Sequence, residues 1–155
     1  MFALMPAFCS PGKVPIQDLN LAANGMTDLD CGDLFNKIIT AHAEYRDQIY
    51  WKYGLRNEIP PADQLIGIKR LDLSFNKLSE RTLFNIGKVM RHDRYILALN
   101  LRANLIDNST ASLLVNCIID NKTLLNLDIR DNIQVKHSVY RKLALKLLSA
   151  YTQVS

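Results

Sequence analysis

Apolar and polar positions alternate in a nine-residue phrase that occurs four times along the chain. Each copy reads apolar-x-x-Leu-x-apolar-x-x-Asn, and the copies span residues 16–24, 68–76, 96–104 and 124–132. The last three asparagines lie 28 residues apart. In a strand, alternate side chains point to opposite faces, so the paired apolar residues of each copy are expected to enter the core, while Asp72 and Ser74 in the second copy point outward. The fixed period predicts one strand per repeat and a structure built by stacking similar units.

A helical pattern follows each strand phrase. Counted from the asparagine, apolar residues recur at the tenth and fourteenth positions, and this separation of four places them on one face of a helix. In the first three repeats the pairs are Leu34 and Ile38, Ile86 and Met90, and Leu114 and Ile118. Ser79 and Ser109 precede the second and third helices, at positions typical of N-caps. The sequence therefore predicts a strand followed by a helix in each repeat.

The fourth repeat is shifted by one residue, because its helical apolar pair is Leu143 and Leu147. We therefore expect one extra residue in the turn after Asn132. With that insertion, Val135 takes the core position that Leu78 holds in the second repeat.

The distance between the first and second repeats is longer than the period. Their asparagines are 52 residues apart, which is 24 residues more than one repeat. The extra residues lie at about 41–66 and do not contain the strand phrase. We expect the first helix to continue to about Tyr53, with Gly54 ending it and a following Pro-Pro pair turning the chain back.

This repeat pattern resembles the leucine-rich repeat family, and its 28-residue length is similar to that of the ribonuclease-inhibitor-like type. The resemblance covers about residues 16–134. It implies an α/β fold, a short solenoid or arc with parallel strands on the concave face and helices on the convex face. The expected organisation is an N-terminal extended arm or cap at 1–15, a repeat domain at 16–151 that contains the helical insertion, and a tail at 152–155.

The last helix is expected at about residues 138–151, where it closes the C-terminal end of the array. Lys142 and Lys146 are expected to face water. They belong to a basic stretch at residues 136–155 that holds four positive charges and no acid. A stretch of this kind is typical of the solvated face of a terminal helix, and it also suits an acidic partner surface.

The outward strand positions form the first candidate binding surface. Three columns run across the four repeats, with a mixture of both charge signs. Arg102 and Arg130 are candidate clamps for a carboxylate, and Phe75 is a candidate apolar contact. The alternative is that these residues are simply solvated. The protein-binding candidates on this surface are Asp72, Ser74, Phe75, Arg102, Asp128 and Arg130.

The insertion forms the second candidate surface, because four large aromatic residues fall within nine positions there. They are Tyr45, Tyr50, Trp51 and Tyr53. Aromatic side chains at helical spacing can anchor a helix in the groove of a partner, or they can pack on the flank of their own repeats. Both interpretations remain open at this point.

Composition and the remaining motifs exclude other classes of protein. Of the 155 residues 48% are hydrophobic and 22% charged, which is typical of one globular domain. The three cysteines and three histidines lack disulfide-framework or metal spacing, and no phosphate-binding glycine loop occurs. We therefore expect no catalytic residue, cofactor or metal, and no enzyme activity. A mixed-charge surface argues against nucleic acid as a partner, and no apolar run is long enough for membrane insertion.

The resemblance implies a non-catalytic protein–protein interaction module. Leucine-rich-repeat proteins of similar size act as scaffold or adaptor subunits of larger assemblies, including cytoskeletal and ciliary ones, and the phrase resembles that of centrosomal and axonemal members. The expected partners are one or more proteins, and the expected location is cytoplasmic, at the cytoskeleton or cilium. The alternative function is a regulator or inhibitor of a specific enzyme, such as a GTPase or nuclease, that binds through the concave face.

Overall fold

The computed structural model describes residues 16–61 and 67–152, so the predicted arm at 1–15, part of the insertion and most of the predicted tail lie outside the described residues. Short strands and helices alternate along the described chain. They are β1 (Asp18–Asn20), α2 (Asp28–Gly54), β2 (Arg70–Asp72), α3 (Glu80–Met90), β3 (Ala98–Asn100), α4 (Asn108–Cys117), β4 (Asn126–Asp128) and α5 (His137–Tyr151). In these ranges we find no helix with the length and apolar character that a membrane crossing requires.

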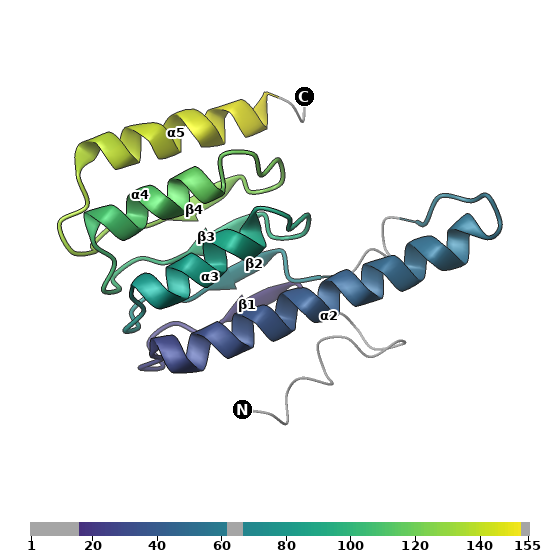
Figure 1. The fold of residues 1–155 in the computed structure, drawn as a ribbon, viewed down its shortest axis with the longest axis horizontal. Helices are drawn as coiled ribbons and strands as arrows, with labels where there is room; N and C mark the ends of the chain where they lie inside the picture. The colour runs from purple at the N-terminus through teal and green to yellow at the C-terminus, as the bar shows by residue number, and fades with distance from the viewer. Residues whose placement is uncertain (1–15, 62–66, 153–155) are drawn as a thin grey trace.

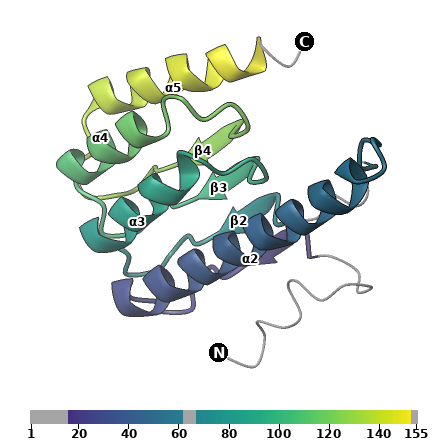
Figure 2. The same ribbon diagram turned by 45° about the vertical axis from the view of Figure 1, so that its right-hand side comes forward.

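The four strands form one parallel sheet in the order β1-β2-β3-β4. The register aligns the same position of every repeat, so that consecutive central leucines are partners: Leu19, Leu71, Leu99 and Leu127. The helices lie side by side on one face of this sheet, and the opposite face is left open by them (Figure 1, Figure 2). The predicted mixed α/β class with parallel strands is confirmed.

The core lies between the sheet and the helices, where the strand and helix patterns predicted it. The tenth- and fourteenth-position residues Ile86, Met90, Leu114 and Ile118 are all buried. Leu34 is half-buried, and the side chain of Ile38 is outside the described part. Burying one such aliphatic side chain contributes roughly 1.5–3 kcal/mol, so each additional repeat stabilises its neighbours.

The asparagines that close the second and third phrases are buried structural residues, and the one that closes the fourth is half-buried. The Asn104 amide nitrogen donates to the carbonyls of Leu73 and Leu101, at 3.0 and 3.1 Å, and its oxygen accepts from the backbone N–H of Leu78. Asn76 and Asn132 make the equivalent bonds one repeat to either side. Backbone groups that the turn leaves unpaired are thereby satisfied across the repeat boundary, which a leucine could not do.

The residue before each of these asparagines has a left-handed backbone. Ala23, Phe75, Ala103 and Asp131 have φ values of 57°, 55°, 52° and 58°. The fourth repeat contains a further left-handed residue, Gln134, with φ 48°. Gln134 lies at the place where the sequence predicts one extra residue in this turn. Val135, which follows it, packs against the core as expected.

The helix N-termini are capped differently from the prediction. Ser79 is the N-cap of α3, but its side chain donates to Asp28 of the preceding helix instead of capping its own. The prediction for Ser109 is wrong: the N-cap of α4 is Asp107, whose carboxylate accepts from the backbone N–H of Thr110 at 2.8 Å. A carboxylate is a stronger acceptor than a hydroxyl at a helix N-terminus, and Ser109 instead donates to it from the first turn.

Helix α2 is far longer than the others and extends past the end of α3 (Figure 1). It ends at Gly54, close to the predicted end near Tyr53. Gly54 does not make the terminating turn, however. Asn57 has the left-handed φ of 55°, and the N–H groups of Asn57 and Glu58 donate back to the carbonyls of Gly54 and Tyr53 at 3.0 and 3.1 Å. This is the hydrogen-bond pattern of a Schellman motif with asparagine in the usual glycine position.

The terminal helix α5 agrees closely with its predicted span, but one of its lysines does not face water. Lys142 is exposed as predicted, whereas Lys146 is buried and its ammonium donates to the carbonyl of Asn121. That carbonyl follows the C-terminal end of α4, where the helix dipole favours a cation. Burial lowers the pKa of Lys146.

Candidate functional site

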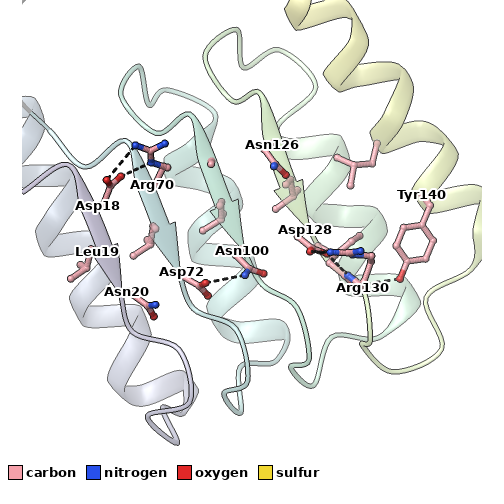
Figure 3. Close-up of a pocket in the computed structure, with 16 residues that line it drawn as sticks. Asp18, Leu19, Asn20, Arg70, Asp72, Asn100, Asn126, Asp128, Arg130 and Tyr140 are labelled. Atoms are coloured by element: carbon pink, nitrogen blue, oxygen red, sulfur yellow. Dashed lines mark hydrogen bonds and ion pairs between the residues drawn. The ribbon is translucent and has the colours of Figure 1, made fainter.

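The face of the sheet that the helices leave uncovered, here called the open strand face, carries the outward-pointing side chains of β1 to β4. They form a first row of Asp18, Arg70, Ala98 and Asn126, and a second row of Asn20, Asp72, Asn100 and Asp128. These residues line a shallow hollow of about 580 Å³ that spans all four strands (Figure 3). Tyr140 and Leu143 of α5 bound it on the side of β4.

The second row has a structural role that explains why it contains only Asn and Asp. In each repeat the side-chain oxygen accepts from the backbone N–H two residues later. The distances are 2.9 Å at Asn20, 2.8 Å at Asp72, and 3.0 Å at both Asn100 and Asp128. This is the Asx-turn bond, which ends each strand by turning its backbone. The candidates Asp72 and Asp128 are therefore already used in part by the fold.

The charged groups on the open strand face are paired with one another. In the first row the guanidinium of Arg70 donates to both carboxylate oxygens of Asp18, at 2.6 and 3.3 Å. Hydrogen bonds from this arginine hold the pKa of Asp18 below its ordinary value. In the second row the amide of Asn100 donates to Asp72 at 3.0 Å. The hollow thus presents polar groups with little net charge.

The two predicted carboxylate clamps are closed on carboxylates of the chain itself. Arg130 donates from Nε and Nη2 to Asp128, at 2.9 and 2.6 Å, and these bonds hold the pKa of Asp128 below its ordinary value. Arg102 donates from Nε to Asp131 at 2.6 Å. A partner carboxylate must therefore displace an internal one to use either arginine.

The neighbouring candidates Ser74 and Phe75 differ in their exposure to solvent. Ser74 was expected to point outward but is buried, because its hydroxyl donates to Asp72 at 2.6 Å within the turn. Phe75 is 56% exposed, and the Arg102 guanidinium lies 5.8 Å from the centre of its ring. The turn holds Phe75 in the left-handed region, which is unfavourable for a bulky residue, and the exposed ring stays a candidate apolar contact.

Sequence reasoning missed the first row and Tyr140. The first row lies two positions before the second row on the same face, so the period of two along each strand was a sufficient signal for Asp18, Arg70 and Asn126. No comparable signal marks Tyr140. Its hydroxyl donates to the carbonyl of Ile129 beside β4, at 3.3 Å, and burial raises the pKa of the phenol.

The aromatic candidates of the insertion lie on the second half of α2, away from the open strand face. We call residues 44–59 the α2 arm. Tyr45 and Tyr53 are half-buried, whereas Tyr50 and Trp51 are exposed at 49% and 70%. The inner side of the arm rests near Tyr95, where burial raises the pKa of that phenol to about 12 and the nearby Arg46 opposes the rise. The structure therefore separates the two candidate surfaces.

Metal-binding clusters and activated thiols are two catalytic features that can be checked in the described residues. Across 16–61 and 67–152 no group of three or more His, Cys, Asp or Glu side chains is placed to hold a metal ion. Cys31 lies in the first turn of α2, where a helix dipole can activate a thiol. Burial, with the nearby carboxylates of Asp28 and Asp30, instead raises its pKa to about 12. That thiol is a core side chain.

No family model matches the chain. The chain is similar to the protein named Centrosomal protein of 78 kDa in three vertebrates. Identity is 31% over 99 residues with that of Xenopus tropicalis, 28% over 117 residues with that of Homo sapiens, and 27% over 113 residues with that of Mus musculus. These alignments cover 63%, 75% and 72% of this chain. The chain spans only 14–17% of the length of these relatives.

Proposed function

We propose that this protein is a non-catalytic protein-binding module, a scaffold or adaptor subunit of a cytoplasmic, centrosome- or cilium-associated assembly. Its fold is a short leucine-rich-repeat solenoid at residues 16–151, with the open strand face as the concave side. The helical insertion at about 41–66 interrupts the first repeat. The partner is another protein, bound as an extended segment along the hollow.

The repeat architecture supports the solenoid. Each repeat contributes one strand and one helix, and the asparagine side chains join each repeat to the next through buried hydrogen bonds. Such repeats contact only their neighbours and build a long surface without a central pocket. This surface suits a partner that lies across several strands.

The centrosomal assignment is supported by the relatives. All three relatives are named as a centrosomal protein, and the alignments with the human and mouse proteins cover 75% and 72% of this chain. Because the chain spans 14–17% of the length of these relatives, their whole activity is not assigned to it. We therefore propose for this chain the binding role and the location, and no enzymatic step.

One observation carries the binding role: a hollow of about 580 Å³ crosses all four strands and is lined by the polar side chains of both rows together with apolar residues such as Leu71 and Leu99. The Asx-turn bonds and the Asp18–Arg70 pair fix these side chains before any partner arrives, so little ordering entropy opposes binding. The hollow is open along its length, and an extended peptide is the ligand shape that fits it.

The test is to fill the centre of the hollow. Ala98 is aligned with Arg70 on one side and Asn126 on the other, so Ala98→Trp places a large ring in the middle of the open strand face. The matched control is Ala144→Trp, because Ala144 is exposed on α5 and does not line the hollow. Tagged wild-type and variant chains are expressed in ciliated cells, imaged against a centrosome marker, and analysed by proximity labelling.

We expect the wild type and Ala144→Trp to concentrate at the centrosome with the same labelled neighbours, and Ala98→Trp to lose both. If Ala98→Trp keeps its location and its neighbours, the open strand face is not the binding site. If the wild type itself shows no centrosomal enrichment, the proposed location is wrong.

A further inference from the structure

Three carboxylates line the hollow of the open strand face, and they differ in the groups that neutralise them. Asp18 forms an ion pair with Arg70, and Asp128 forms one with Arg130. Asp72 of β2 lies between these two pairs (Figure 3). Within residues 16–61 and 67–152 no basic side chain forms an ion pair with it. Asp72 is therefore the exception to the charge pairing on this face.

The neutral partners of Asp72 do not use all of its capacity to accept hydrogen bonds. An ionised carboxylate has about four acceptor sites on its two oxygens. The Oδ1 atom of Asp72 accepts two bonds from Ser74, at 2.8 and 2.6 Å, and its Oδ2 atom accepts one from the amide of Asn100 at 3.0 Å. In Asp128 each oxygen already accepts two bonds. Asp72 thus has room at Oδ2 for one further donor, and Asp128 has none.

The place of Asp72 in the hollow favours a charged donor over a neutral one. Asp72 is half-buried, so a charge brought next to it is screened less than on an exposed surface. A hydrogen bond between a cation and a carboxylate is also about twice as strong as one between neutral groups. A half-buried carboxylate that has only neutral partners is therefore an acceptor prepared for an ammonium or guanidinium group.

Ala98 leaves space beside Asp72 for the side chain that carries such a group. The other three positions of the first row hold larger polar residues. Ala98 lies two residues before Asn100, which is the register partner of Asp72, so its methyl group is diagonal to the carboxylate on the same face. The aliphatic stems of lysine and arginine pack on apolar groups while their charged ends stay with polar ones. Ala98 and Asp72 together match these two parts.

The other charges around the hollow are engaged elsewhere. The lining contains three acids and two arginines, so it has one negative charge in excess. Lys69, which is not part of the lining, attracts Asp18 at the β1 side. Arg102, also outside the lining, donates to Asp131. The uncompensated acid inside the hollow is therefore Asp72.

We propose that the partner segment bound in the hollow carries a lysine or arginine whose charged end donates to Asp72 and whose aliphatic stem lies over Ala98. This inference rests on the proposed function and deepens it, because it states the chemistry of the partner. The partner is an extended protein segment with a basic side chain that faces β2 and β3.

The experiment selects peptides for the hollow from a random library. Phage that display short random peptides are first depleted on immobilised full-length Ala98→Trp and then selected on the wild type, so that only peptides that need the hollow remain. The selected peptides are synthesised, and their dissociation constants are measured by fluorescence anisotropy. We expect them to share a lysine or arginine at one position.

The variant that tests the contact is Asp72→Asn. It removes the charge but keeps an oxygen that can accept from Ser74, as Asn20 and Asn100 do in the turns of their own repeats. We expect the selected peptides to bind this variant about tenfold or more weakly than the wild type. The matched control is Asp120→Asn, which removes the same charge from an exposed residue outside the hollow and should leave binding unchanged. Circular dichroism of each variant verifies that the fold is kept.

A second change, in the peptide, isolates the pair. Replacing the shared basic residue by glutamine should weaken binding to the wild type by about tenfold and should have little effect on binding to Asp72→Asn. Added salt should also weaken the binding of the basic peptide to the wild type more than to Asp72→Asn, because only the wild type forms an ion pair.

The outcomes separate this inference from the proposed function. Selected peptides that lack a basic residue, or that bind Asp72→Asn as tightly as the wild type, overturn the inference and leave the hollow as a binding site. A glutamine peptide that is weakened equally on both proteins places the basic residue elsewhere and also overturns it. If no peptide distinguishes the wild type from Ala98→Trp, the hollow does not bind extended peptides, and the proposed function fails together with the inference.

Discussion

The repeat body and the α2 arm differ in where their polar and apolar groups find partners. On the open strand face, the charged side chains are paired with each other, as Arg70 is with Asp18 and Arg130 with Asp128. On the arm, Trp51 and Leu55 face solvent. Arg70 finds its partner at the same register of the neighbouring repeat, and Arg130 finds its partner in its own repeat. The arm lies outside the 28-residue period, and its exposed apolar side chains have no repeat beside them in register.

This difference decides where a substitution should affect stability. Side chains of the body are positioned by the repeats on each side, so replacing one is felt across a repeat boundary. Trp51 and Leu55 of the arm are largely exposed. Substitutions in the body should therefore change the free energy of unfolding, and substitutions of these exposed side chains should change it little.

The largest expected effect comes from Asn104→Ala. This side chain is 5% exposed and bonds to carbonyls and an N–H of two repeats. Its removal leaves the buried N–H of Leu78 without its acceptor, which costs about 1–3 kcal/mol. It also removes one of the two side-chain donors from the carbonyls of Leu73 and Leu101, which keep those of Asn76 and Asn132. We expect a loss of about 3 kcal/mol in the free energy of unfolding, measured by urea denaturation followed by circular dichroism.

Asn24→Ala is the matched control, because Asn24 holds the same position in the first repeat. It is exposed, and its side-chain amide donates to the carbonyl of Ala22, two residues away. We expect a loss of less than about 1 kcal/mol. Equal losses in the two variants would contradict the view that the asparagine acts by joining successive repeats.

A smaller effect is expected at Asp28, whose side chain joins the start of α2 to the start of α3. Asp28, in the first turn of α2, accepts from the backbone N–H of Ser79 at 2.8 Å and from the hydroxyl of Thr82 at 2.6 Å. It thereby caps α3 from the neighbouring helix. Asp28→Ala should cost about 1–2 kcal/mol in unfolding free energy, which is typical of a lost N-cap. Asp30→Ala, which affects only the cap of α2 itself, should cost less.

The contribution of Asp28 should also depend on pH. Burial alone would raise its pKa, but the hydrogen bonds from Ser79 and Thr82 outweigh burial and hold the pKa below the ordinary value of 3.8. A depressed pKa in the folded state stabilises the fold above the unfolded-state pKa, and this contribution is lost as pH falls through the folded-state value. The stability difference between wild type and Asp28→Asn should be constant from about pH 7 to about pH 5 and shrink below about pH 4. A difference that grows on acidification would contradict this assignment.

The repetition of the phrase was sufficient to predict most of the fold. The two apolar positions of each strand and the pair on each helix are set by periods of two and of about 3.6, and these residues need no further information to be placed. The shift in the fourth repeat was visible because Val135, Leu143 and Leu147 all move by one. The length of α2 could be predicted because residues 41–66 do not contain the strand phrase, so the first helix had no strand to end it.

The errors occurred where one polar residue could take several partners. Ser74 and Lys146 were expected to face water because the period of a strand or helix predicts the direction of the Cα–Cβ bond. It does not predict which polar group the end of the side chain binds. Ser74 folds back onto Asp72, and Lys146 reaches the carbonyl of Asn121. The pairing of Arg102 with Asp131 depends on the relative position of two turns, which periodicity does not determine.

The smallest expected effect concerns Phe75, an exposed aromatic residue of the body that resembles Trp51 of the arm in its exposure. Its φ of 55° is the value shared by Ala23, Ala103 and Asp131, but a bulky side chain makes this conformation less favourable. Phe75→Gly removes the strain, and the greater entropy of glycine in the unfolded chain offsets part of the gain. We expect a net stabilisation of about 0.5 kcal/mol by urea denaturation, with Ala103→Gly as the control that removes no ring.

Proximity labelling with tagged Phe75→Gly should at the same time show weaker labelling of the proteins that the tagged wild type labels. A variant that is less stable than wild type would show that the ring contributes to folding through its contact with Arg102, and Phe75 would then belong with the internally satisfied residues of the body.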